Sequence, residues 1–326
     1  MSKFLKLLFI FLLILAGLAC SLDFVITSGL RKTDLRSYQA WNDIFASNIK
    51  SDAVILGSSR AWCQYSPQIL DSIVGLDFYN LGIDGHKIDY QLIRYNTYRR
   101  FSPKPRYIIH NVEFSTLGVT TNGYDREQFF PYVFDDSLLN VVSEVKKITF
   151  LDRKLPLVRY FGYRVLFENG VKSFFGQKTF FDGGLKKGYR GNNYPWDGTE
   201  LDKIQTIQYE RNPNAIKLFD EYLKKSKDEG IEVILVFAPV YIDAIKKIEN
   251  IEEMYTLYSD IAGKYNYTIL DFSNDSISFD KENFYNATHL NKKGAEEFSI
   301  KLGRRLNSVI TNKSTEKEQA FEKYFF

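Results

Sequence analysis

Cysteine and histidine are scarce in this sequence, and their scarcity excludes several kinds of site. The 326 residues include only two cysteines, Cys20 and Cys63, and three histidines. Cys20 lies in an apolar N-terminal run, so Cys63 has no partner in the rest of the chain and is interpreted as a buried structural thiol. We therefore expect neither a disulfide framework nor a cysteine-based metal site.

Dense runs of positive charge, internal repeats and low-complexity tracts are also absent. The 43 lysines and arginines are nearly balanced by 40 acidic residues, which leaves a net charge of +3. Binding to nucleic acid needs concentrated positive charge, so nucleic acid is excluded as a partner. With 44% hydrophobic and 16% aromatic residues, the chain can form one large α/β domain or two small ones.

The longest apolar run lies at the N-terminus. It extends from Leu7 to Leu22, follows Lys3 and Lys6, and is interrupted by Asp23. We interpret residues 1–26 as an uncleaved signal anchor, with the lysines inside and Asp23 near the outer interface. The soluble part would then lie outside the cytoplasm, in the periplasm or at the cell surface.

Three other interpretations of this run stay open. A lipoprotein signal, our second choice, would make Cys20 the lipidated residue, although Gly17 stands where a larger aliphatic residue is usual. A cleaved signal peptide would use the small residues at 16–19. A buried core helix is disfavoured because the run is N-terminal, nearly uncharged and has no amphipathic stripe.

Short apolar segments alternate with helical ones in the rest of the chain, which is typical of a parallel α/β sheet. Helices are expected around residues 67–73, 84–102, 214–229, 241–264 and 292–307. Strands are expected at residues 53–56, 77–81, 106–112, 231–238 and 267–271.

This rhythm divides the chain into segments. Residues 27–51 are expected to form a juxtamembrane helix, and residues 52–310 the main domain. Residues 120–212 break the rhythm and are interpreted as an aromatic-rich insertion, whose rings we expect to form a satellite core in preference to a surface that stacks on sugars. Residues 311–326 are expected to form a loosely ordered polar tail.

The first strand ends in Gly57-Ser58-Ser59-Arg60. A glycine at the end of a buried strand permits a sharp turn that presents a serine hydroxyl above the carboxyl edge of a sheet. The motif alone also fits an ordinary helix start, with Ser58 or Ser59 as N-cap.

Serine hydrolysis also needs a base, and the three histidines limit the choice. His110 lies inside a strand and is interpreted as a satisfied core or edge residue, and His86 opens a helix. His289 lies in the loop 273–290, after the last strand, where a loop can return to the carboxyl edge of the sheet. His289 is therefore the candidate base.

Four short blocks, in this order, resemble those of the SGNH (GDSL-type) hydrolases. The closest resemblance is to the membrane-anchored, extracytoplasmic branch, which includes D-alanine transfer proteins and proteins of polysaccharide O-acetylation. This resemblance implies a three-layer, flavodoxin-like α/β fold with a five-stranded parallel sheet. The blocks are Gly57-Ser58-Ser59-Arg60, Asn80-Leu81-Gly82, Asn111, and Asn286-Ala287-Thr288-His289-Leu290-Asn291.

The resemblance also implies the roles of individual residues. Ser59 matches the nucleophile and His289 the base. The oxyanion would be held by the backbone N–H groups of Ser59 and Gly82 and by the side-chain amide of Asn111. The match at Asn111 is loose, because His110-Asn111-Val112-Glu113 stands where Gly-x-Asn-Asp is usual.

The sequence departs from the family at Asn286, where an aspartate is usual. Asparagine can accept a hydrogen bond from histidine but supplies no charge, and in a serine protease triad the same exchange costs about four orders of magnitude in rate. Three explanations stay open: a Ser–His dyad suffices, the site binds without turnover, or another acid takes the place, namely Asp271, Asp275 or Asp280.

Arg60, directly after the matched nucleophile, has two interpretations. It could hold a substrate carboxylate or phosphate, or it could pair with an acid such as Asp84 or Glu113, which we slightly favour.

The sequence thus predicts an extracytoplasmic serine esterase or O-acyltransferase, with acetyl as the expected group and a cell-envelope glycan as substrate. No metal or cofactor is implied, and a membrane acyltransferase is a candidate partner. The alternative is a catalytically impaired member that binds a glycan or an envelope assembly partner.

Overall fold

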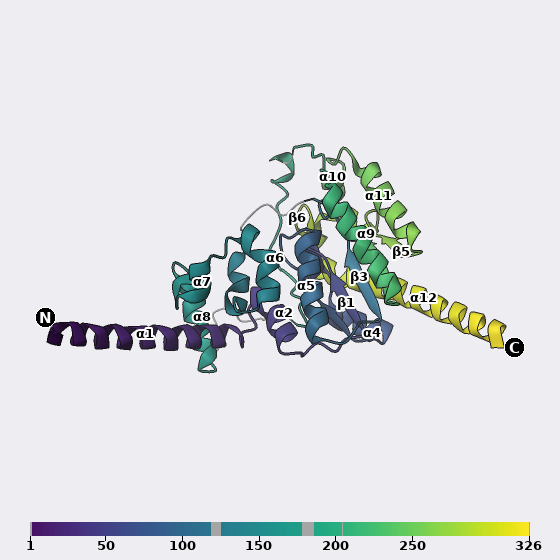
Figure 1. Ribbon diagram of the computed structural model, residues 1–326. Coiled ribbons are helices and arrows are strands. Elements are labelled where there is room, and N and C mark those ends of the chain that lie inside the picture. The colour runs from purple at the N-terminus through teal and green to yellow at the C-terminus, as the bar shows by residue number, and fades with distance from the viewer. Residues whose placement is uncertain (1, 119–124, 178–185, 204, 326) are drawn as a thin grey trace. The chain divides into compact units, whose positions relative to one another are not determined.

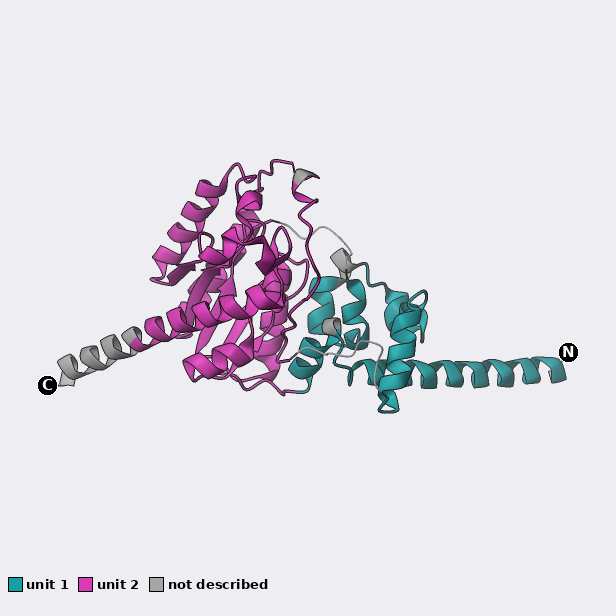
Figure 2. Cartoon of the chain, turned by 180° about the vertical axis from the view of Figure 1, so that it is seen from behind, with its two compact units in different colours: residues 1–46, 121–185 teal, residues 47–120, 186–326 magenta. Residues whose placement is uncertain are grey.

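The computed structural model describes residues 2–118, 125–177, 186–203 and 205–325, with the backbone alone for residues 2, 36–37, 143–146, 202 and 312–325. The chain forms two compact units (Figure 2). The smaller unit combines residues 1–46 and 121–185, and the larger combines residues 47–120 and 186–326.

The larger unit is built on a five-stranded parallel sheet with strand order β2-β1-β3-β4-β5. The register aligns Ile55 of β1 with Asn80 of β2 and with Ile109 of β3. Each strand lies within one residue of its predicted bounds, so the predicted flavodoxin-like sheet is confirmed. The strands are β1 (Ala53–Leu56), β2 (Phe78–Asn80), β3 (Tyr107–Asn111), β4 (Glu232–Phe237) and β5 (Thr268–Asp271).

Helices cover both faces of this sheet (Figure 1). Phe298, Leu302 and Leu306 of α12 pack with Ile55 and Ile234 on one face. On the other face His110 of β3 meets Phe219 of α9. Parallel strands covered on both faces read as continuous apolar runs. The helices of this unit are α3 (Ser59–Gln64), α4 (Pro67–Val74), α5 (Ile88–Phe101), α9 (Pro213–Asp228), α10 (Ile242–Ile245), α11 (Ile251–Lys264) and α12 (Lys292–Phe325).

Short elements complete this unit. A hairpin of β6 (Phe284–Asn286) and β7 (His289–Leu290) lies within the segment 273–290, which we expected to be a plain loop. Three short 3₁₀ helices are η3 (Leu201–Lys203), η4 (Ser276–Phe279) and η5 (Lys281–Asn283).

Two further differences from the sequence prediction concern α10, α11 and α12. The helix expected at 241–264 is divided into α10 and α11, because the backbone of Ile207 pairs with Lys247 and Glu249 between them. Helix α12 continues to Phe325, so the backbone of the expected loose tail is helical.

The strand order creates a switch point between β1 and β3. From β1 the chain turns to β2 on one side, and it then returns to β3 on the other side. In open α/β sheets, ligands bind at the carboxyl edge beside such a point. The motif after β1 and Asn111 at the end of β3 therefore lie where a functional site is expected.

The smaller unit is helical. Its core contains Ile26 and Leu30 of α1, Tyr38 of α2, Phe130 and Tyr160. Its elements are α1 (Ser2–Leu30), α2 (Arg36–Phe45), η1 (Arg126–Tyr132), α6 (Asp136–Lys146), α7 (Phe150–Lys154), η2 (Val158–Tyr160) and α8 (Arg164–Phe174). The sequence interpretation divided these residues differently: here the N-terminal 46 residues and residues 121–185 form one unit, while residues 186–212 belong to the larger unit.

Helix α1 combines an exposed apolar part with a packed part. Among the described residues it is the one helix long and apolar enough to cross a membrane, a property that signal sequences share. At its other end α1 crosses α8, where a Cβ on Gly170 would lie 2.7 Å from the carbonyl oxygen of Ile26. Glycine is required at this crossing because the two backbones approach so closely.

A buried ion pair also joins α1 to the smaller unit. Arg159 donates from Nη2 to Oδ2 of Asp23 at 2.5 Å and to Thr27 at 2.9 Å. The other oxygen of Asp23 accepts from the N–H of Leu157 at 2.8 Å. The Arg159 side chain is 1% exposed, so loss of its partner would leave a buried charge without compensation.

We therefore predict that Asp23→Asn destabilises the smaller unit by about 3 kcal/mol, because breaking a buried pair on one side leaves the other charge buried. Thermal unfolding and limited proteolysis of the detergent-solubilised full chain would measure the loss. Glu168→Gln is the matched control: its partner Arg164 is 89% exposed, and exposed pairs contribute little. Equal stability of the two variants would contradict the prediction.

Candidate active site

The turn after β1 holds Ser59 at the carboxyl edge of the sheet. Gly57 has φ +143°, and a Cβ there would lie 2.9 Å from Cβ of Asn111 and 2.8 Å from Cβ of Ala61. Only glycine fits such a position without strain. Ser59 is the first residue of α3, so its N–H has no partner within the helix.

The β6–β7 hairpin brings His289 to this turn. Nε2 of His289 lies 2.8 Å from Oγ of Ser59, within hydrogen-bond distance. Both side chains are half-buried. The hairpin turn between Asn286 and His289 thus returns to the sheet edge as the sequence analysis expected of this loop.

Asn286 fixes the orientation of His289. Its Oδ1 accepts from the backbone N–H groups of Thr288 at 3.0 Å and of His289 at 2.9 Å, so this atom is the carbonyl oxygen of the amide. The same oxygen lies 2.9 Å from Nδ1 of His289. A carbonyl oxygen can only accept, so Nδ1 carries the proton and Nε2 faces Ser59 as an acceptor.

The three aspartates considered as substitutes for Asn286 have hydrogen-bond partners elsewhere. Oδ1 of Asp271 accepts from the N–H of Ser273 at 2.8 Å. Asp275 accepts from Lys301 at 2.6 Å, and Asp280 caps the N–H of Glu282. Besides Oδ1 of Asn286, a hydroxyl lies near Nδ1 of His289: Oγ1 of Thr288 is 3.0 Å away.

Glu113 is a buried carboxylate beside the turn that holds Ser59. Oε1 accepts from Ser58 Oγ and, at 3.0 Å, from Nδ2 of Asn111. Oε2 lies 3.2 Å from Nη2 of Arg60. Burial by itself would raise the pKa of Glu113, but the positive charge of Arg60 and the bonds from Ser58 and Arg60 outweigh it and hold the pKa below its ordinary value.

Arg60 therefore forms the acid pair that the sequence favoured, and Glu113 is the partner. The sequence analysis named Glu113 only as a candidate partner for this arginine. Its position two residues beyond a predicted strand, at the carboxyl edge, is the signal that could have marked it as a site residue.

Asn111 is fully buried at the end of β3. Its Oδ1 accepts from Tyr65 OH at 2.6 Å, and one hydrogen of Nδ2 goes to Glu113. An amide nitrogen has two hydrogens, so one donor of Asn111 is left after this bond.

Gly82 differs from the sequence expectation of a free oxyanion donor. Its N–H donates to Oδ1 of Asn80 at 2.9 Å. Nδ2 of Asn80 is held by the carbonyls of Ala61 at 2.7 Å and Tyr65 at 3.0 Å, which directs Oδ1 toward Gly82. A Cβ on Gly82 would lie 2.5 Å from the backbone nitrogen of Trp62, so close packing already accounts for the glycine.

The other two histidines are core residues. His110 is fully buried, which lowers its pKa to about 3, and its Nε2 lies 2.9 Å from Oε1 of Gln91. His86 is buried and stacks on Tyr90. Both therefore remain outside the serine–histidine arrangement.

Aromatic rings flank His289. Tyr285 stacks on its imidazole with centroids 5.4 Å apart, and Tyr194, which is 67% exposed, meets the edge of Tyr285. Trp196 packs on Tyr241 and Phe284. Cys63 is buried, with its sulfur 3.8 Å from the hydroxyl of Tyr285. Trp196 thus belongs to the core, while Tyr194 is available at the surface.

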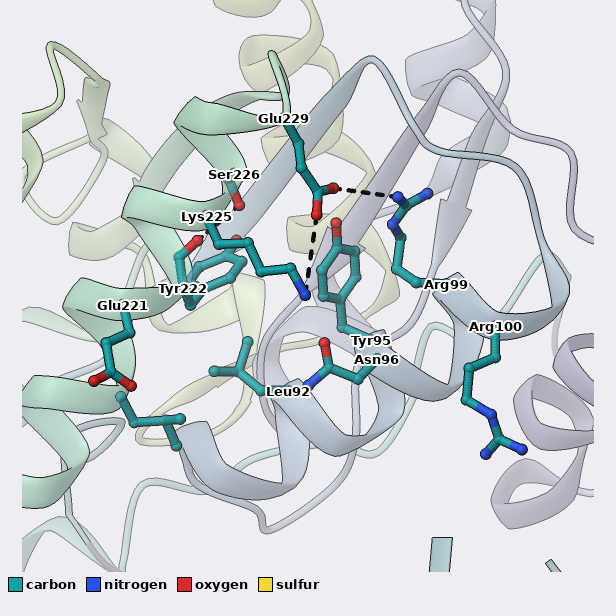
Figure 3. Close-up of a pocket in the computed structure, with 11 residues that line it drawn as sticks. Leu92, Tyr95, Asn96, Arg99, Arg100, Glu221, Tyr222, Lys225, Ser226 and Glu229 are labelled. Atoms are coloured by element: carbon teal, nitrogen blue, oxygen red, sulfur yellow. Dashed lines mark hydrogen bonds and ion pairs between the residues drawn. The ribbon is translucent and has the colours of Figure 1, made fainter. Parts of the chain in front are cut away.

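A pocket of about 560 Å³ lies elsewhere, between α5 and α9 (Figure 3). Glu229 in this pocket pairs with Arg99 at 3.2 Å and with Lys225 at 3.9 Å. Neither Ser59 nor His289 lines it. Among the described residues no group of three or more histidine, cysteine or acidic side chains could hold a metal ion.

Comparisons with known proteins add the following. No family model matches this chain, and no curated protein matches it. Similar solved structures include a protein described as a platelet activating factor from Streptococcus pneumonia, with 12% identity and a TM-score of 0.40 over 91% of this chain and 98% of that chain.

Two further solved structures are a lipolytic protein of the G-D-S-L family from Desulfitobacterium hafniense DCB-2 and an acylhydrolase from Bacteroides fragilis NCTC 9343. The first has 14% identity and a TM-score of 0.37 over 77% of this chain and 97% of that chain. The second has 10% identity and a TM-score of 0.37 over 81% and 95%. All three descriptions are provisional, and at these identities and scores they carry no argument about activity.

Proposed function

We propose that this protein is a serine acyl esterase or O-acyltransferase of the SGNH type. The observation that carries the proposal is the hydrogen-bonded series Ser59–His289–Asn286, in which the histidine presents an unprotonated nitrogen to the serine hydroxyl. Nucleophile, base and orienting group in hydrogen-bond reach are the signature of covalent catalysis by serine.

In the proposed mechanism Ser59 Oγ attacks the ester carbonyl while Nε2 of His289 takes the hydroxyl proton. The oxyanion accepts a hydrogen bond from the N–H of Ser59. On the family resemblance the remaining N–H of Asn111 is a second donor, which requires the substrate to uncover an amide that is fully buried in the free protein. The C–O bond to the leaving alcohol breaks as His289 returns the proton to that oxygen. Water or an acceptor hydroxyl then attacks the seryl ester by the same steps in reverse order, and Ser59 is regenerated.

Gly82 contributes a third oxyanion donor only if its bond to Asn80 is exchanged for one to the substrate. We retain it as a proposed donor on the family resemblance, since its N–H is hydrogen-bonded to Asn80 Oδ1 in the free protein.

Asn286 fulfils one of the two roles of a triad aspartate. It orients the ring and selects the tautomer, but it supplies no charge for the imidazolium. Glu113 is a carboxylate that interacts electrostatically with His289. We assign Glu113 a positioning role, because it also holds Arg60 and the amide of Asn111.

We further propose that α1 anchors the chain in a membrane with the catalytic unit outside the cytoplasm, and that the substrate is an acylated envelope glycan. The apolar length of α1 and the preceding lysines support the anchor,. The exposed ring of Tyr194 beside Tyr285 supports a sugar substrate. A membrane acyltransferase would supply the acyl group in the transfer reaction.

The second candidate is a binding protein that uses the same site without turnover. Asn286 is the observation that favours it, because the imidazolium formed during reaction lacks an adjacent negative partner on Nδ1. The two candidates share the ligand class and differ in whether Ser59 becomes acylated.

Ser59→Ala should abolish hydrolysis of p-nitrophenyl acetate and labelling by a fluorophosphonate, because both need the hydroxyl. Ser72→Ala is the control, since Ser72 is an exposed serine of α4 in the same unit. Initial rates of the purified full chain would measure the effect. If wild type and Ser59→Ala both match the buffer rate, and wild type takes no label, the binding protein becomes the better description.

Asn286→Asp should raise kcat/KM by about tenfold or more, a part of the ~10⁴-fold effect of this exchange in a serine protease triad. The added carboxylate favours the protonated imidazole, so the acid limb of the kcat/KM profile should move to higher pH. Rates measured across pH would detect both changes. An unchanged rate and profile would mean that another acid already supplies the charge.

Glu113→Gln should lower kcat with little change in KM, because one oxygen that accepts hydrogen bonds becomes a donor facing Ser58, Asn111 or Arg60. Glu253→Gln, at the exposed pair with Arg211 in the same unit, is the control. Because the pKa of Glu113 is lowered in the folded protein, its ionised carboxylate stabilises the fold at pH values above the ordinary pKa of a glutamate. This stabilisation is lost as the pH falls through the lowered pKa,. Thermal unfolding of Glu113→Gln should therefore depend less on acid pH than that of wild type.

A further inference from the structure

The smaller unit exposes an unusual number of large apolar side chains. Phe161 is 90% exposed, Phe150 70%, Phe175 68% and Val165 56%. In the described part of the larger unit the exposed large apolar residues are Tyr194, Ile207, Phe279 and Ile300. Isolated apolar residues at a surface are ordinary, but a gathered set marks an interaction site.

We propose that this set, the apolar collar, rests in the interfacial layer of the lipid bilayer that α1 enters. The collar consists of Phe150, Leu151, Leu155, Phe161, Val165 and Phe175. This inference rests on the proposed anchor and is independent of the proposed catalytic activity.

Segments that carry the collar contact α1 close to the end of its apolar run. The N–H of Leu157 bonds to Asp23, and Phe174 meets Phe24 edge to face with centroids 6.3 Å apart. The turn between α7 and η2 and the end of α8 thus contact α1 directly after its apolar run ends. Figures 1 and 2 show α7 and the end of α8 at the side of the smaller unit from which α1 projects.

The apolar run of α1 is shorter than the hydrocarbon core of a bilayer. Leu7 to Leu22 extends roughly 24 Å at 1.5 Å per residue, while the hydrocarbon core of a bilayer is about 30 Å thick. A short segment is accommodated by thinning of the bilayer or by the side chains that flank it. The collar supplies apolar surface at the point where the run stops.

Charged side chains border the apolar collar. Lys154 is exposed beside the apolar residues, as is Arg164, which pairs with Glu168 at 2.7 Å. A basic side chain such as Lys154 at this depth attracts anionic headgroups. A hollow of about 570 Å³ beside Phe161 is lined by Leu157, Tyr160, Phe161 and Phe167. The hollow is also lined by the paired charges of Arg164 and Glu168. Aromatic and aliphatic side chains bordered by charged ones are typical of surfaces that lie in the headgroup region.

The buried pair of Asp23 and Arg159 lies where the apolar run of α1 meets the segment that carries the collar. Arg159 also contacts the ring of Tyr160, with its guanidinium carbon 4.8 Å from the centroid. Because both charges compensate each other inside the unit, Asp23 can stand at the end of the membrane segment without facing lipid as a free charge.

The test uses the full chain in proteoliposomes of phosphatidylethanolamine and phosphatidylglycerol, with Cys20→Ser as background. The remaining Cys63 is buried. The fluorophore NBD is placed at Phe150→Cys, Phe161→Cys, Leu13→Cys in α1, or Lys224→Cys on the exposed surface of α9. Emission maxima and quenching by doxyl-labelled lipids are compared, and thermal unfolding confirms that each variant is folded.

NBD at Phe150→Cys and Phe161→Cys should show blue-shifted emission that shallow doxyl lipids quench, while Lys224→Cys should show neither. Emission at these two positions equal to that at Lys224→Cys would overturn the proposal. A blue shift without lipid quenching would also overturn it, and would indicate cover by protein, either a partner or a second copy. Leu13→Cys reports the anchor separately: quenching by deep doxyl lipids there, without quenching at the collar, would refute the collar alone.

Discussion

The contact between the turn after β1 and the end of β3 is the constraint on which the site depends. Gly57 lies against Asn111 so closely that any side chain there would overlap it. This approach is possible only because β1 and β3 are neighbours in the sheet. It brings Ser59 and the amide of Asn111, which are distant in sequence, to one point of the carboxyl edge, and the hairpin adds His289 there.

The charged and neutral groups around Ser59 and His289 have separate positions. The group that orients His289 is neutral Asn286, while the buried carboxylate lies on the other side, among Ser58, Asn111 and Arg60. The Arg60–Glu113 pair keeps this region close to electrical neutrality. In the proposed mechanism this matters, because an isolated carboxylate near Ser59 would oppose a developing oxyanion. The arrangement separates the orientation of the base from the compensation of charge.

The chain also combines two kinds of packing. The larger unit buries its apolar side chains between sheet and helices. The smaller unit leaves many of them exposed around α1, although it contains a buried ion pair and close helix contacts that give it a defined structure. A surface of this kind is understandable when part of the solvent is lipid, because apolar side chains then need no protein cover.

The sequence by itself determined the sheet and the position of the candidate nucleophile and base. Strands buried on both faces are continuous apolar runs, and Gly57 directly follows one, so local pattern was sufficient for the sheet and for the turn at Ser59. His289 was chosen among three histidines by its place in the loop after the last strand and in the fourth family block. Element ends were also set locally, as at Pro67 and Pro213, which begin α4 and α9. These features depend on residues close together in the chain.

Only the tertiary structure decided which groups meet. The pairing of Glu113 with Arg60 was one of two choices in the sequence, and the bonds from Ser58 and Asn111 to Glu113 were not foreseen. The union of residues 1–46 with 121–185 in one unit, and the commitment of the Gly82 N–H to Asn80, were likewise hidden. The reason is physical: hydrogen bonds and compensated charges depend on distances between segments far apart in sequence, and apolar periodicity carries no information about them.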